Sequence, residues 1–182
     1  MPRIVEEHAY NGVIAKISRL GAGGLLVELR EILTGWDLRL FEVKNANGGA
    51  VVREKIDQRF AQAGGWTKAT SGDIDWQKCK IVNGTRICVG VEIQVSARSD
   101  LIVMDVIHLR KAIVDGMIDF GVMVVPSAAM SVFLIDRAPS ISDAKRHVLA
   151  ARADDLPLLV LALEHDGPAP EALPKRRRKV IE

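Results

Sequence analysis

The spacing of hydrophobic residues changes along the chain, and each type of spacing predicts a different secondary-structure element. Two nearly continuous apolar runs, 118–125 and 158–163, are typical of strands buried on both faces, and the first should be central in its sheet. Between them, 141–153 has apolar residues at helical spacing and follows Ser140, a favoured N-cap. Strand, helix and strand in this order predict a parallel crossover.

Amphipathic helices are predicted elsewhere from the same spacing of apolar residues, over 13–20, 25–33, 50–63 and 101–115. The helix over 50–63 should turn Val51, Ile56 and Phe60 toward the core. Residues 1–44 as a whole are predicted to be mixed and mostly helical, and 127–139 to be a loop or a short strand.

Asn83-Gly84 is the strongest turn signal in the chain, because this dipeptide favours the two-residue turn of a β-hairpin. If the flanking strands pair without a bulge, the numbers of facing residues sum to 167. Asp75 then faces Glu92, in a pair without backbone hydrogen bonds between its members, where side chains approach closely. Cys79 and Cys88 face each other in the same way.

Side chains alternate between the two faces of a strand, so Gln94 shares the face of Glu92. The opposite face, with Ile74, Trp76 and Ile93 among its members, is expected to be core. Two facing carboxylates repel, and a divalent cation such as Mg²⁺ would compensate them. The alternative is a hairpin face open to solvent, on which the acids only increase solubility.

Length and composition, 182 residues and 48% hydrophobic, favour one domain over 1–166. A basic tail follows over 167–182, and its run Pro174 to Val180 holds five of the 25 basic residues, which leaves the rest of the chain slightly acidic despite a formal charge of +2. Three interpretations of this run stay open: an arm that contacts phosphates, a nuclear-localisation signal, and a solvated tail.

Several other functions are disfavoured by the sequence. There is no run of 18 apolar residues and no signal segment, so we expect a cytoplasmic protein with no membrane partner. In a reducing compartment Cys79 and Cys88 should remain thiols, and two cysteines with four scattered histidines make a zinc site improbable. His108 is expected to have no catalytic role, and Glu54 to form surface ion pairs more readily than to serve as an outer metal ligand.

Asp75 followed by Glu92-Ile93-Gln94-Val95-Ser96 resembles the active-site motif of BglII-type restriction endonucleases. These enzymes are a branch of the PD-(D/E)xK nucleases in which glutamine replaces the usual lysine. The similarity extends from about 47 to 167, although this chain has a longer connection between the two acids. The resemblance implies an α/β restriction-endonuclease-like fold, a central mixed β-sheet flanked by helices.

The resemblance also implies an activity, hydrolysis of phosphodiester bonds in double-stranded DNA at a short, palindromic site. Asp75, Glu92 and the carbonyl of Ile93 would bind Mg²⁺, with Mn²⁺ as a substitute, and Gln94 would place the attacking water. Contacts to DNA are assigned to two segments: Ser96, Ala97 and Arg98 after the motif, and Lys175, Arg176, Arg177 and Arg178 in the tail. A homodimer would match the two-fold symmetry of such a site. The alternatives are a structure-specific repair or recombination nuclease and a catalytically silent DNA-binding module.

Overall fold

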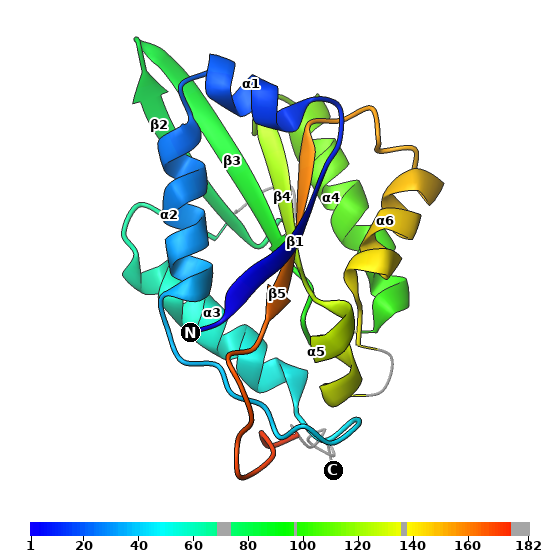
Figure 1. The fold of residues 1–182 in the computed structure, drawn as a ribbon. Helices are drawn as coiled ribbons and strands as arrows, with labels where there is room; N and C mark the ends of the chain where they lie inside the picture. Colours follow the sequence, from blue (N-terminus) through cyan, green and yellow to red (C-terminus); the bar gives the residue numbers. More distant parts are fainter. Residues whose placement is uncertain (69–73, 97, 136–137, 176–182) are drawn as a thin grey trace, which may run out of the picture.

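A computed structural model describes residues 1–68, 74–96, 98–135 and 138–175 (Figure 1). Along the chain its elements are β1 (Arg3–Ala9), α1 (Val13–Arg19), α2 (Gly23–Thr34), α3 (Gly49–Gln62), β2 (Trp76–Val82), β3 (Thr85–Ile93), a 3₁₀ turn at Ser99–Leu101, α4 (Ile102–Val114), β4 (Phe120–Pro126), α5 (Ala128–Phe133), α6 (Ile141–Ala150) and β5 (Leu158–Glu164). In this part of the chain no helix is long and apolar enough to cross a membrane.

The strands form one five-stranded mixed sheet in the order β1-β5-β4-β3-β2. The three inner strands β3, β4 and β5 are parallel, and the edge strands β1 and β2 are antiparallel to their neighbours. Every residue of β4 is buried, as a central strand covered on both faces requires. The predictions of a mixed α/β sheet flanked by helices, a central strand near 118–125 and a parallel crossover through α6 are therefore confirmed.

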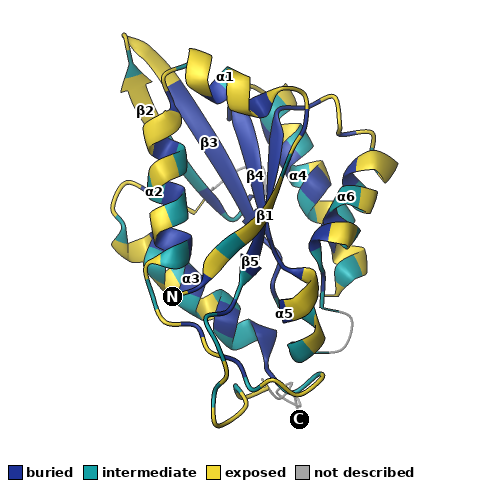
Figure 2. Cartoon of the chain, viewed as in Figure 1, coloured by how far each residue is buried: buried dark blue, intermediate teal, exposed yellow. Residues whose placement is uncertain are grey.

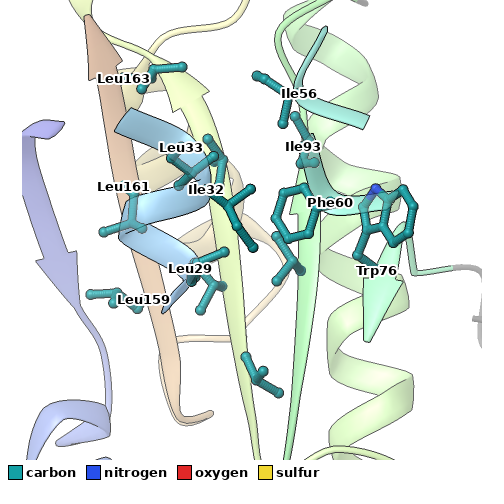
Figure 3. Packing of buried hydrophobic residues seen from close by; sticks show 14 of the residues in the cluster. Leu29, Ile32, Leu33, Ile56, Phe60, Trp76, Ile93, Leu159, Leu161 and Leu163 are labelled. Atoms are coloured by element: carbon teal, nitrogen blue, oxygen red, sulfur yellow. The ribbon is translucent and has the colours of Figure 1, made fainter. Parts of the chain in front are cut away.

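Two hydrophobic layers enclose the sheet. One packs α1, α2, α3 and Met130 of α5 against one face, and Figure 3 shows Phe60 of α3 beside Trp76 within it. The other packs α4 and α6 against the opposite face. Figure 2 shows β3, β4 and β5 largely buried between the two layers, whereas β1 at the edge is mostly exposed. Both faces of β3 are therefore covered.

The hairpin forms at the predicted turn and in the predicted register. Asn83 and Gly84 both have positive φ, 50° and 79°, as the two central residues of a type I′ turn require. Trp76 pairs with Val91 and Cys79 with Cys88, so facing numbers sum to 167. The two cysteines are joined in a disulfide across this pair, with their Cα atoms 4.0 Å apart. The structure thus differs from the expected free thiols, because the register puts the two sulfur atoms within bonding reach.

Two local predictions were wrong, and one strand was not predicted. Residues Arg3–Ala9 form the edge strand β1, where no element was predicted; only Ile4 and His8 of it are partly buried, so it lacks the alternation by which a strand is recognised. Residues 128–133 form α5, which Ser127 caps by accepting a hydrogen bond from the Met130 N–H. On α3, Val52 is buried in place of the predicted Val51, so the prediction is one residue off at this position.

The first part of the predicted tail lies against the body of the protein. Pro168 forms a bridge with Leu40, and the Gly48 N–H donates to the Leu173 carbonyl over 3.0 Å. The fully buried Asn47 accepts from the Leu173 N–H at 3.2 Å. These bonds fix the segment up to Leu173 beside the N-terminal end of α3, whereas 176–182 lie outside the described residues.

Candidate metal centre

The hairpin brings together the three side chains that the motif singles out. Asp75 directly precedes β2, Glu92 is the penultimate residue of β3, and Gln94 directly follows β3. An oxygen of Asp75 accepts a hydrogen bond from the Ile93 N–H at 2.8 Å, and the side chains of Asp75 and Glu92 are hydrogen-bonded. Glu92 is only 3% exposed and Gln94 7%. The two acids therefore meet at the end of the hairpin that is remote from its turn.

The polar face of the hairpin is covered by α4, so the alternative of a solvent-open face is excluded for Glu92. Ile74 was predicted to lie on the opposite face, and this is wrong. It packs in the same layer as Cys88 and α4, because the backbone bends at Asp75 and the strand alternation does not extend past Trp76. The bend also turns the Asp75 carboxylate toward the backbone of β3.

Helix α4 adds two polar side chains that the sequence did not single out for this site. Asp105 and His108 are three residues apart, so they share one side of the helix. His108 Nδ1 lies 3.2 Å from Glu92 Oε1, and the Gln94 side chain lies close enough to the Asp105 carboxylate to lower its pKa. One oxygen of Asp105 is buried without a hydrogen-bond partner among the described residues. The spacing Asp105-x-x-His108 is common on helices, and only contact with Glu92 distinguishes it.

One ligand atom from each of Glu92, Asp105 and His108 lies within 4.8 Å of the other two, so this cluster could hold a metal ion. The two carboxylates suit Mg²⁺ or Mn²⁺ in chemical type, and the imidazole suits Zn²⁺ and other transition metals. The unpartnered oxygen of Asp105 would gain the partner that the protein itself does not supply. The residues present therefore fit a divalent cation.

The acids of the centre repel one another in the metal-free protein. Burial, followed by the charge and hydrogen bond of Asp75, raises the pKa of Glu92 to about 11. Burial and then Asp75 raise the pKa of Asp105 to about 7. Glu92 is therefore a neutral carboxylic acid at neutral pH, as expected when carboxylates share a buried site without a cation. A bound divalent cation would reverse this effect and favour the ionised forms.

Arg53 of α3 contacts two of the three groups predicted to bind the metal. Its guanidinium donates to the Ile93 carbonyl at 2.6 Å and to an oxygen of Asp75 at 2.5 Å, and its Nε donates to Asp57 at 3.1 Å. Although burial lowers the pKa of Arg53, the charges and hydrogen bonds of Asp75 and Asp57 raise it overall. Nothing in the sequence marks Arg53 for this site, and only the packing of α3 beside the hairpin brings it here.

A pocket of about 420 Å³ opens beside the centre and is lined by Arg53, Glu54, Lys68, Ser96 and neighbours on α3. A second pocket of about 220 Å³ is lined by Ser96 and Lys175 together. Two residues predicted to contact DNA are thus brought to one place although 79 positions separate them (175 − 96). Arg98 instead forms an exposed ion pair with Asp100. Ala97 and Arg176, Arg177 and Arg178 lie outside the described residues.

Comparison with protein-family models and with curated proteins finds no match for this sequence. The fold and the centre therefore define a class only in structural terms. The protein is a mixed α/β protein in which the end of an inner parallel strand carries a buried carboxylate, surrounded by two further acids, an imidazole and an arginine.

Proposed function

We propose that the protein is a metal-dependent endonuclease of restriction type that hydrolyses phosphodiester bonds in double-stranded DNA. One observation carries the proposal. Glu92, buried at the end of β3, lies against Asp75, Asp105 and His108, and Gln94 follows two residues later on the same face. Buried acids gathered without enough donors are costly to a fold, and a site that uses a divalent cation explains why they are there.

Each residue of the centre has a role in this proposal. Glu92, with Asp75 and the Ile93 carbonyl on one side and Asp105 and His108 on the other, would hold Mg²⁺ or Mn²⁺. The bound cation would activate water and stabilise the charge that develops on the phosphate. Gln94 would orient the water, with its side chain beside the Asp105 carboxylate. Ser96 lines both pockets and Lys175 lines the second one with it, so these two residues would contact phosphates of the duplex.

The restriction-endonuclease-like fold is part of the same proposal. A helix, the hairpin that carries Asp75 and Glu92, a second helix, a parallel strand, two helices and a further parallel strand follow one another as α3, β2, β3, α4, β4, α5, α6 and β5. This order supports the resemblance, and the covered position of Glu92 supports a dry site in which a cation acts strongly.

A homodimer is proposed because cutting both strands of a palindromic site needs two centres related by two-fold symmetry. Met104 and Ile107 of α4, and Leu101 directly before this helix, are exposed, and α4 also supplies Asp105 and His108. Light scattering after size-exclusion chromatography tests this point. A monomer at micromolar concentration in the presence of DNA would rule out the dimer and leave single-strand nicking.

Supercoiled plasmid incubated with Mg²⁺, and separately with chelator, tests the proposed activity. Discrete fragments that depend on Mg²⁺ are expected. A smear would favour the alternative of a nuclease that recognises DNA structure. The further alternative, a silent DNA-binding module, has one observation in its favour, because Arg53 already neutralises Asp75. DNA retained in a gel-shift experiment but left uncut with both Mg²⁺ and Mn²⁺ would establish it.

A further inference from the structure

The guanidinium of Arg53 lies where two of the predicted metal ligands converge. It donates to both the Asp75 carboxylate and the Ile93 carbonyl, at 2.5 and 2.6 Å. A divalent cation that used these oxygens would compete with these two N–H groups for them. It would also lie next to a fixed positive charge, which weakens its binding. Arg53 and the cation therefore compete for this pair of oxygens.

Two features of the structure indicate that the guanidinium can bind a different partner in the adjoining pocket. The pocket of about 420 Å³ beside the centre is lined by Arg53 itself, together with the cation of Lys68 and the hydroxyl of Ser96. Nε of Arg53 donates to Asp57, one turn further along α3, and Asp57 also lines this pocket, so the guanidinium already lies at the edge of the pocket. The planar fork of an arginine suits a phosphate as well as it suits a carboxylate.

We propose that Arg53 exchanges its partners during binding. In the metal-free protein it holds Asp75 and the Ile93 carbonyl together, and with substrate it turns to a phosphate group of the DNA in the adjoining pocket and releases both oxygens to the divalent cation. The inference rests on the proposed function, since it takes these oxygens as metal ligands. It makes Arg53 a positioning residue that couples arrival of the phosphate backbone to loading of the metal.

Metal binding without DNA tests the first half of the exchange. Isothermal titration of Mn²⁺ into Arg53→Gln should give binding at least tenfold tighter than in wild type, because the guanidinium that competes with the metal is gone. Lys55→Gln is the matched control: it removes one positive charge from the same helix, and Mn²⁺ affinity should change less than twofold. Arg53→Lys, which keeps the charge but not the fork, should lie between. It also replaces Arg53→Gln if that variant does not fold. Arg53 variants that bind Mn²⁺ no more tightly than wild type would overturn the exchange.

NMR of the arginine Nε–H groups in the wild-type protein tests the second half of the exchange, the move of Arg53 to a DNA phosphate. The Arg53 signal is assigned by its loss in Arg53→Lys. The signal should shift when Mg²⁺ is added, and again when a short DNA duplex is added in chelator. A signal that moves with Mg²⁺ but not with the duplex would overturn the exchange, because phosphate would not be the second partner. Failure of the proposed function is distinguishable: plasmid would stay uncut by wild type, while Arg53→Gln still bound Mn²⁺ more tightly.

Discussion

The two faces of β3 are equally buried but differ in kind. Its odd-numbered residues, among them Val89, Val91 and Ile93, join the apolar layer with α1, α2 and α3. Its even-numbered residues face α4 and end in Glu92, with Gln94 beyond the strand. On the first face burial is favourable by itself, because apolar area leaves water. On the second, burial at the strand end is unfavourable for the ionised forms of Glu92 and Asp105, and it raises the pKa of both.

A second carboxylate, Glu164 at the end of β5, shows that burial alone does not make a strained site. It is also largely buried, but the hydroxyl of Ser127 and the His165 N–H both donate to it. Glu92 instead has Asp75 as a neighbour, with Asp105 close enough to raise its pKa further. What distinguishes the candidate centre is therefore a shortage of donors and cations around buried acids. A bound metal ion would supply the missing positive charge.

Replacing Glu92 should have the largest effect. Glu92→Gln is expected to reduce Mg²⁺-dependent cleavage by at least ~10³-fold, because the metal is worth several kcal/mol of transition-state stabilisation. The free energy of unfolding in chelator should stay equal or rise, since a buried acid beside other acids is removed. Plasmid cleavage and urea denaturation measure the two quantities. Wild-type cleavage by this variant would contradict the assignment.

The apolar face should respond in the opposite way. Phe60 is fully buried and its ring lies 4.9 Å from that of Trp66 and 5.4 Å from that of Trp76. Phe60→Ala should lower the free energy of unfolding by about 3–5 kcal/mol, the usual cost of such a cavity. Mn²⁺ affinity of the folded protein should change little, because Phe60 contacts the other face of the sheet. A loss of stability below about 1 kcal/mol would show that this layer can repack.

The acids on the second face of β3 should also make the stability of the protein depend on pH. The pKa values of Glu92 and Asp105 are raised in the folded protein from 4.5 and 3.8 to about 11 and about 7, so above pH 4 the folded state binds more protons than the unfolded state. Their contribution is complete below these unfolded values and is lost as pH rises, through about 7 for Asp105 and toward 11 for Glu92.

Thermal unfolding in chelator should therefore show a melting temperature that falls from pH 6 to pH 9. Glu92→Gln should flatten this slope, and saturating Mn²⁺ should restore stability at pH 9 by binding only the folded protein. A wild-type melting temperature that rises over the same interval would contradict the raised pKa values.

The smallest loss of stability is expected from a substitution in the β2–β3 turn, which sets the register of the hairpin. Gly84 has φ of 79°, and no atom lies within 4 Å of where a Cβ would be, so Gly84→Ala meets backbone strain alone. The expected loss is about 1–2 kcal/mol of stability, with cleavage retained. Gly23→Ala is the matched control, since Gly23 is helical and equally uncrowded, and it should be neutral or slightly stabilising.

Local sequence determined much of this molecule. Asn83-Gly84 favours one turn type, and this turn fixes the register that brings Asp75 to Glu92. The apolar runs determined β4 and β5, and Ser140 with Asp143 determined the start of α6 through a capping box. In each case the information lies within a few residues of the element, so no distant contact is needed to read it.

The tertiary structure alone decided what surrounds Glu92. Arg53, Asp105 and His108 lie on helices whose own periodicity says nothing about the hairpin, and they reach Glu92 or its neighbours only because α3 and α4 pack at the end of β3. The same holds for β1, an exposed edge strand that exists through its pairing with β5. Side-chain clusters of this kind depend on contacts between residues far apart in the chain, and a pattern of neighbouring residues does not contain them.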